Sequence, residues 1–184
     1  MGWVAADEAR HDDARGIESW GFAFAGSEAT GQIRLTLDVA HAQASYVVDL
    51  RLARLGRVVV ADETVPVPRP TAGLEIRTDG LWASLYCETA FEHWTLGLEA
   101  FGLRVGADAA APSWDALVGD RVPVGFDLEW ELTAAPEPLA DGNGYRQVGT
   151  LVGQVLVERD RLDLESTAER DHWWGMAREQ APRG

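Results

Sequence analysis

Residues 32–39 read Gln32-Ile33-Arg34-Leu35-Thr36-Leu37-Asp38-Val39, with an apolar side chain at every second position. Because successive side chains of a β-strand point to opposite faces, this alternation predicts a strand with one buried face. The same pattern recurs at Tyr46–Leu52 and at Phe126–Leu132. Asp79-Gly80 separates two further apolar segments and favours a type I′ hairpin turn. The pattern therefore indicates antiparallel β-structure.

The number and spacing of the strands narrow the architecture. About ten candidate strands start roughly ten residues apart, which leaves no room for βαβ crossovers and predicts an all-β sandwich or barrel. His93–Arg104 and Tyr145–Val157 are long and contain glycines, which suit the bends of a barrel better than a flat sheet. Closure also removes exposed edges. We therefore predict a single antiparallel β-barrel, with one short helix near residues 108–118 that Gly119 ends.

The predicted domain boundaries are a polar N-terminal segment at residues 1–16, the barrel at residues 17–175 and a C-terminal tail at residues 176–184. Residues 4–15 are compatible with a short, poorly packed helix. The first fifteen residues are acidic and lack the apolar core of a secretory signal. The single Cys87 can form no intrachain disulfide and is expected to be a small buried hydrophobe. Together these features predict a cytoplasmic protein.

The charge of the chain excludes several partners and reactions. The net charge is −14, and all 16 basic residues are arginine. Such a surface repels phosphate backbones and anionic lipids, so we expect neither nucleic acid nor a membrane as a partner. The absence of lysine excludes Schiff-base chemistry. No run of the sequence approaches the roughly 20 apolar residues that a membrane-spanning helix needs.

Familiar catalytic and metal-binding motifs are absent from the sequence. It contains no Gly-rich phosphate loop, no nucleophile elbow and no kinase signature. Its ligand-type residues His11-Asp12-Asp13 and Asp171-His172 are direct neighbours, and neighbours on a strand point to opposite faces. We therefore expect no metal and no cofactor. What remains is binding of a small molecule, or cofactor-free chemistry driven by shape and one or two polar groups.

The eight tryptophans suit either a packed core or the walls of a cavity, since a barrel of about eight strands can hold one small ligand. On the predicted strand at residues 81–88, the even-numbered face mixes aromatic and polar side chains, which suits a pocket lining or a solvated surface. A carboxylate or imidazole in an apolar cavity can act as a general acid or base. The candidate wall residues are Trp20, Tyr46, Trp82, Tyr86, Trp94, Phe101 and Trp130. The candidate catalytic residues are Glu88, His93 and Glu99.

Several stretches of the chain resemble a known superfamily. They are Asp79–Trp82 with Cys87–Thr89, Phe91–Gly102, Gly119–Glu131 and Glu169–Gly175. Together they resemble bacterial proteins related to hydroxyneurosporene synthase (carotenoid 1,2-hydratase) and the AttH-like superfamily. The resemblance implies lipocalin-like barrels, two in each relative, with an apolar ligand held near their junction. Related proteins include lipocalin-like Diels–Alderases, which close rings in natural-product pathways.

The resemblance also implies site residues. Asp171, His172 and Trp174 match the motif associated with the functional region, and Trp173 stands where relatives usually have a small residue. Only nine residues follow Gly175, whereas relatives continue into a second barrel. Either the lumen of this barrel is the working site, or two chains pair as a homodimer to rebuild the missing surface.

Three functions fit these features. The first is a cofactor-independent enzyme that holds an apolar polyene, polyketide or isoprenoid in the lumen and promotes cyclisation, including [4+2] addition, hydration or isomerisation. The second is a non-catalytic binder or carrier of a hydrophobic small molecule. The third is an interaction domain whose barrel is fully packed.

Overall fold

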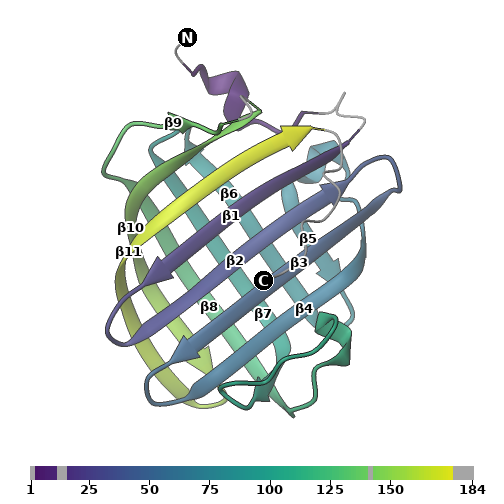
Figure 1. The fold of residues 1–184 in the computed structure, drawn as a ribbon, viewed down its shortest axis with the longest axis vertical. Helices are drawn as coiled ribbons and strands as arrows, with labels where there is room; N and C mark the ends of the chain where they lie inside the picture. Colours follow the sequence, from purple (N-terminus) through teal and green to yellow (C-terminus); the bar gives the residue numbers. More distant parts are fainter. Residues whose placement is uncertain (1–2, 12–15, 141–142, 176–184) are drawn as a thin grey trace.

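The computed structural model describes residues 3–11, 16–140 and 143–175, and within them it is an all-β protein. Eleven strands form one antiparallel sheet that curves round into a barrel (Figure 1). The strands are β1 (Ile17–Ala25), β2 (Ala29–Asp38), β3 (Gln43–Leu52), β4 (Gly56–Pro66), β5 (Leu74–Thr78), β6 (Leu81–Thr89), β7 (His93–Val105), β8 (Asp120–Leu132), β9 (Glu137–Pro138), β10 (Gly144–Val157) and β11 (Asp160–Gly175). The prediction of a single antiparallel barrel is confirmed.

The helical content is limited to three short 3-10 helices in the part of the chain that the structure describes. They are η1 (Ala5–Glu8), η2 (Pro70–Ala72) and η3 (Trp114–Ala116). The helix predicted near residues 108–118 is therefore only the single turn η3. No helix among the described residues has the length and apolar character needed to cross a membrane.

The ring closes through strands that are far apart in the sequence. β1 pairs with β11 along its whole length, from Ile17 opposite Gly175 to Ala25 opposite Thr167. On the other side, β7 pairs with β6 along residues 93–100 and with β4 along residues 103–105. The first and last strands of the barrel are thus neighbours, which brings side chains from both ends of the chain to one place.

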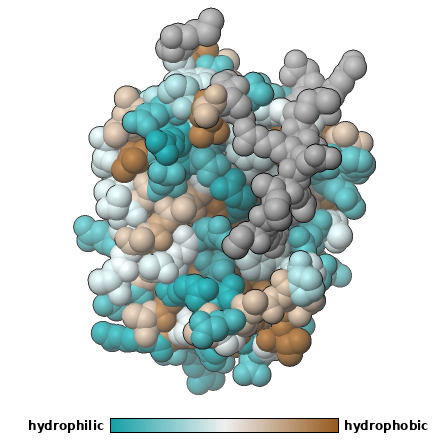
Figure 2. Space-filling view, in the orientation of Figure 1, coloured by the Kyte–Doolittle hydropathy of each residue, from teal (hydrophilic) through white to brown (hydrophobic). Residues whose placement is uncertain are grey.

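The barrel interior is filled by the inward positions of the alternating strands. On β2 the buried positions are Ala29, Ile33, Leu35 and Leu37, and the last three are those that the alternation in residues 32–39 predicts. Bulky aromatic side chains from the other strands complete the core, among them Trp20, Phe22, Tyr46, Trp94 and Trp130. Across the face in Figure 2, where grey atoms do not cover it, hydrophilic and hydrophobic side chains are intermixed.

One glycine is required by the close approach of two strands. Gly153 in β10 has φ +143°, and a Cβ added to it would collide with the carbonyl oxygen of Asp127 in β8. We expect Gly153→Ala to lower the free energy of unfolding by about 2–3 kcal/mol, because the positive φ and the backbone collision both add strain. Gly106→Ala is the control, since a Cβ there meets nothing within 4 Å. Urea unfolding of both variants measures the difference, and equal stability would contradict this account of the packing.

Candidate functional site

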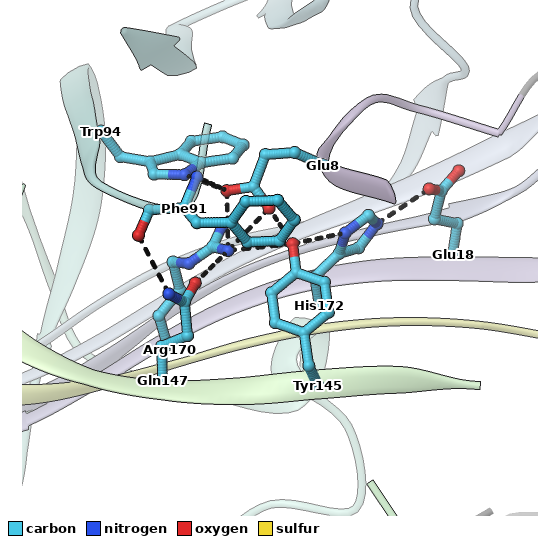
Figure 3. Close-up of polar contacts among 8 residues, drawn as sticks. All are labelled: Glu8, Glu18, Phe91, Trp94, Tyr145, Gln147, Arg170 and His172. Atoms are coloured by element: carbon cyan, nitrogen blue, oxygen red, sulfur yellow. Dashed lines mark hydrogen bonds and ion pairs between the residues drawn. The ribbon is translucent and has the colours of Figure 1, made fainter. Parts of the chain in front are cut away.

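The 3-10 helix η1 lies over one end of the barrel (Figure 1), and buried polar side chains gather beneath it (Figure 3). Glu8, Glu18, Gln147, Arg170 and His172 are all buried there, within an otherwise apolar interior. Burying a charged group is costly unless it is paired or hydrogen-bonded. This cluster is therefore the candidate functional site.

Arg170 lies at the centre of the cluster and is 0% exposed. Its Nη2 donates to the Glu8 carboxylate at 2.8 Å, to the Tyr145 hydroxyl oxygen at 3.0 Å and to Gln147 Oε1 at 2.7 Å. Among the described residues, its Nε and Nη1 have no hydrogen-bond partner. Burial lowers the pKa of Arg170 from its ordinary value, an effect that the negative charge of Glu8 partly offsets. The guanidinium thus keeps hydrogen-bonding capacity that the described chain does not use.

Aromatic rings surround this guanidinium. Its central carbon lies 4.9 Å from the ring centre of Trp94 and 5.3 Å from the ring centres of both Trp130 and Tyr145. A cation over the face of an aromatic ring is attracted by the electrons of the ring, more strongly where water is excluded. Together, the rings form an apolar box that favours a cation at this position.

Glu8 reaches this box from outside the barrel wall. Its carboxylate accepts hydrogen bonds from Trp94 Nε1 at 2.8 Å, from the backbone amide of Phe91 at 3.2 Å and from the Tyr145 hydroxyl, in addition to Arg170 (Figure 3). Trp3 covers Tyr145, with ring centres 4.9 Å apart. The short, poorly packed helix expected within residues 4–15 corresponds to η1, and among residues 4–11 only Glu8 is buried, because it inserts into the barrel. Residues 12–15 lie outside the described residues.

A second chain of contacts runs from Tyr145 to the neighbouring wall. His172 Nδ1 lies 3.3 Å from the Tyr145 hydroxyl, and His172 Nε2 lies 2.9 Å from Glu18 Oε1. The same Glu18 oxygen lies 2.8 Å from His11 Nδ1. Trp20 stacks on His172 with ring centres 4.7 Å apart. Burial lowers the pKa of His172, opposed by the hydrogen bond and charge of Glu18, so the neutral imidazole is favoured.

The Tyr145 proton is shared between two acceptors. A neutral His172 that donates from Nε2 to Glu18 presents the lone pair of Nδ1 to the Tyr145 hydroxyl. The Glu8 carboxylate accepts from the same hydroxyl. Tyr145 has one proton to donate, so withdrawal of Glu8 would leave this proton to His172 or to a bound molecule.

The strand register explains why these residues meet. Tyr145 lies opposite His172, and Gln147 lies opposite Arg170, on the paired strands β10 and β11. These four side chains occupy inward positions of their strands. Asp171, between the two inward residues of β11, points outward and forms a two-pronged ion pair with Arg34 at 3.0 and 2.7 Å.

The structure divides the predicted site residues between two faces. Trp20, Tyr46, Trp94, Trp130 and His172 are buried inside the barrel. Of these, Trp20 Nε1, Trp130 Nε1 and the Tyr46 hydroxyl have no hydrogen-bond partner among the described residues. Burial strongly raises the pKa of Tyr46, so this hydroxyl stays neutral.

The remaining predicted residues do not line the lumen. On β6 the buried positions are Leu81, Ala83 and Leu85, so the opposite, even-numbered face points outward. On β7, Glu99 and Phe101 are likewise exposed. The expectation that the following residues face the lumen is therefore wrong: Trp82, Tyr86, Glu88, Glu99 and Phe101. Trp82 and Phe101 instead border a hollow of about 530 Å³ on the outer surface.

His93, Trp174 and Cys87 also lie outside the lumen or only partly within the barrel wall. His93 is also on the outer face, 3.6 Å from Glu129. Trp174 lies at the barrel end and stacks on His11, with ring centres 4.2 Å apart. Cys87 is partly buried, and its pKa is raised to about 11, mainly by burial and then by Glu8. A reactive thiol at neutral pH does not fit this environment.

The sequence analysis missed most of the cluster, namely Glu8, Glu18, Tyr145, Gln147 and Arg170. For four of them the sequence does contain an indication of a buried polar site. Glu18, Tyr145, Gln147 and Arg170 occupy positions in strands whose alternation points them inward, where a polar residue is unusual. Glu8 carries no such signal, because its place depends on how the N-terminal segment crosses the barrel end.

The buried charge pair predicts an asymmetric response to mutation. Glu8→Gln leaves Arg170 charged and trapped on a central strand, and we expect it to cost about 3–5 kcal/mol of unfolding free energy. Arg170→Met should cost clearly less, because Glu8 lies on a segment at the barrel end and can turn out into water. Urea unfolding at pH 7 measures both variants. Equal losses, or a stable Glu8→Gln variant, would show that the pair is not a buried charge pair in solution.

In comparisons with known proteins, no protein-family model, curated protein or solved structure matches the chain.

Proposed function

We propose that this protein binds an apolar small molecule with a carboxylate head group, at the barrel end where Glu8 now lies. The observation that carries the proposal is the Arg170 guanidinium, which is fully buried yet has two nitrogen atoms without a hydrogen-bond partner among the described residues. Its negative partner comes from a segment that does not belong to the barrel wall. An internal carboxylate in this position is a model for the head group of a ligand.

The groups around Glu8 suit a carboxylate from another molecule. Arg170 Nη2, Trp94 Nε1, the Phe91 amide and the Tyr145 hydroxyl all donate to the present carboxylate. A ligand carboxylate in the same place would accept these hydrogen bonds and neutralise the arginine. The remaining Arg170 nitrogens would allow additional hydrogen bonds to the ligand.

The apolar part of the ligand would lie on the aromatic rings at the barrel end. Phe91, Tyr145 and Trp174 lie beside the Glu8 carboxylate or beneath Trp3. A ligand that displaces residues 3–11 would exchange Trp3 and Glu8 for its own apolar body and head group. Polyene, polyketide and isoprenoid acids combine both features. The ligand would therefore bind at the open end of the barrel. The site expected from the sequence was the lumen instead.

Binding can be tested with a long-chain isoprenoid acid and its methyl ester, followed by tryptophan fluorescence. We expect the acid to bind at least about tenfold more tightly than the ester, a difference of about 1.4 kcal/mol, because only the acid carries a charge for Arg170. Arg170→Met should remove this preference. Glu8→Gln should strengthen binding of the acid, since the internal competitor is weakened.

Arg77→Met is the matched control, because Arg77 is exposed and pairs with Glu75 on the outer surface. It should bind both ligands as the wild type does. Equal binding of acid and ester by the wild type, or an unchanged preference in Arg170→Met, would refute the carboxylate site.

A second candidate is acid–base catalysis on the bound molecule without a cofactor, and the Tyr145–His172–Glu18 chain favours it. For hydration of a carbon–carbon double bond, Tyr145 would give its proton to one carbon and water would add to the other. The surplus proton of that water would return to the phenolate through His172. Proton delivery of the same kind would serve isomerisation or cyclisation. The resemblance to carotenoid hydratases and lipocalin-like Diels–Alderases points to the same class of apolar substrates.

Tyr145→Phe separates catalysis from binding. If Tyr145 delivers the proton, this variant should still bind the isoprenoid acid but should convert a linear polyene substrate about 10²–10⁴ times more slowly, the usual contribution of one general acid. Product formation is followed by chromatography, with His41→Ala as a control on the exposed surface. Turnover equal in wild type and Tyr145→Phe, or equal to buffer alone, would leave binding as the function.

A further inference from the structure

Three metal-ligand side chains converge beside the Arg170 cluster. His11 Nδ1 and His172 Nε2 lie 2.8 and 2.9 Å from the same oxygen of Glu18. The ligand atoms of these residues all lie within 4.8 Å of one another. They come from three separate parts of the chain, the N-terminal segment, β1 and β11. No sequence spacing could indicate this cluster, because the β1–β11 pairing creates it.

We propose that His11, Glu18 and His172 bind a divalent transition-metal ion of the Zn²⁺ type. Two imidazoles and one carboxylate form the protein ligand set of many zinc sites and of iron sites with two histidines and one carboxylate. A tetrahedral ion about 2 Å from each ligand holds the ligand atoms roughly 3.3 Å apart. The separations of 2.8 and 2.9 Å between Glu18 and the two imidazoles need to widen slightly to admit the ion, while the two imidazole nitrogens lie within 4.8 Å of each other.

The burial of Glu18 supports a cation at this position. Its side chain is 0% exposed, and the hydrogen bonds described for it come from the His11 amide and the two imidazoles. None of these donors carries a fixed positive charge. A buried carboxylate is stabilised when a cation balances its charge. A divalent ion between the three side chains would provide that charge directly.

The surroundings hold both imidazoles in place for an ion. With Nε2 bound to an ion, His172 Nδ1 would carry the proton and donate to the Tyr145 hydroxyl oxygen at 3.3 Å, the reverse of the direction without metal, and the His172 ring stacks on Trp20. The His11 ring stacks on Trp174 at 4.2 Å with an interplanar angle of 27°. Such contacts orient metal-binding histidines and strengthen the site. His11 is 24% exposed, so an ion can reach the cluster from its side, and water can complete the coordination.

A second group of ligand-type residues serves as the internal comparison. His93, Glu129 and Glu131 also lie close together, but on the outer face of β7 and β8. His93 is 32% exposed and Glu129 54% exposed. Exposed acidic groups of this kind are common without a metal. We therefore assign the ion to the buried cluster.

The metal ligands are not the residues that contact the proposed carboxylate, but a ligand that displaces residues 3–11 would also remove His11 from the ion. The metal site has a consequence for the N-terminal segment, since Glu8 and His11 lie on the same stretch of chain. A metal ion coordinated by His11 would tie this stretch to β1 and β11.

The test uses the metal alone, on untagged full-length chain treated with EDTA and then freed of chelator. Zn²⁺ is titrated against a chromophoric chelator, and Co²⁺ is added separately to record its visible absorption spectrum. We expect one tightly bound ion per wild-type chain and a Co²⁺ spectrum of low-coordinate type with nitrogen and oxygen ligands. His11→Ala should weaken Zn²⁺ binding by more than roughly a hundredfold, beyond what loss of a supporting hydrogen bond costs.

His11→Ala is the decisive variant, because His11 is partly exposed and its replacement should leave the barrel folded. Glu18→Gln, checked for folding by circular dichroism, should weaken binding likewise. His93→Ala and His41→Ala are the controls and should bind as the wild type does. Absence of tight Zn²⁺ binding by the wild type, unchanged binding in His11→Ala, or loss of binding in His93→Ala would each overturn the assignment. None of these outcomes bears on carboxylate binding at Arg170, which is measured without metal.

Discussion

The Arg170 guanidinium carries its charge inside an apolar barrel, and the structure of the barrel end follows from the need to stabilise it. Its hydrogen bonds to Tyr145 and Gln147 use inward positions of β10 that would otherwise be apolar. Its charge requires a negative partner that no neighbouring strand position supplies, and Glu8 of the N-terminal segment fills this role. The segment is therefore held over the barrel end by electrostatics as well as by packing.

Two polar systems meet at Tyr145. One runs through Arg170 to Glu8, and the other runs through His172 to Glu18 and His11. Each system includes one side chain from residues 3–11, so the same segment completes both. Movement of this segment would expose Arg170, free the Tyr145 proton and remove one imidazole from Glu18 together. The carboxylate site and the metal site that we propose would thus be coupled through one stretch of chain, although each uses its own residues.

The fold was predictable because alternation is a local property. The apolar positions of β2 and of β8 identify their buried faces without knowledge of their neighbours. For β6 the same rule did not decide which face is buried, since one face carried aliphatic residues and the other carried Trp82 and Tyr86. In the structure the aliphatic face is buried, because large rings from other strands, such as Trp20, Trp94 and Trp130, already fill the lumen. The bulky residues of β6 are left on the outer surface.

The sequence by itself determined the antiparallel barrel, the length of its strands and the burial of several tryptophans. The resemblance of Glu169–Gly175 to a known motif also marked His172 as a candidate site residue. Only the tertiary structure decided which polar residues meet, because Glu8, Glu18, Tyr145 and Arg170 come from distant parts of the chain. Alternation shows to which face of the sheet a side chain points. Strand pairing and the path of the N-terminal segment determine which residues it contacts there, and both are set by the closed ring as a whole.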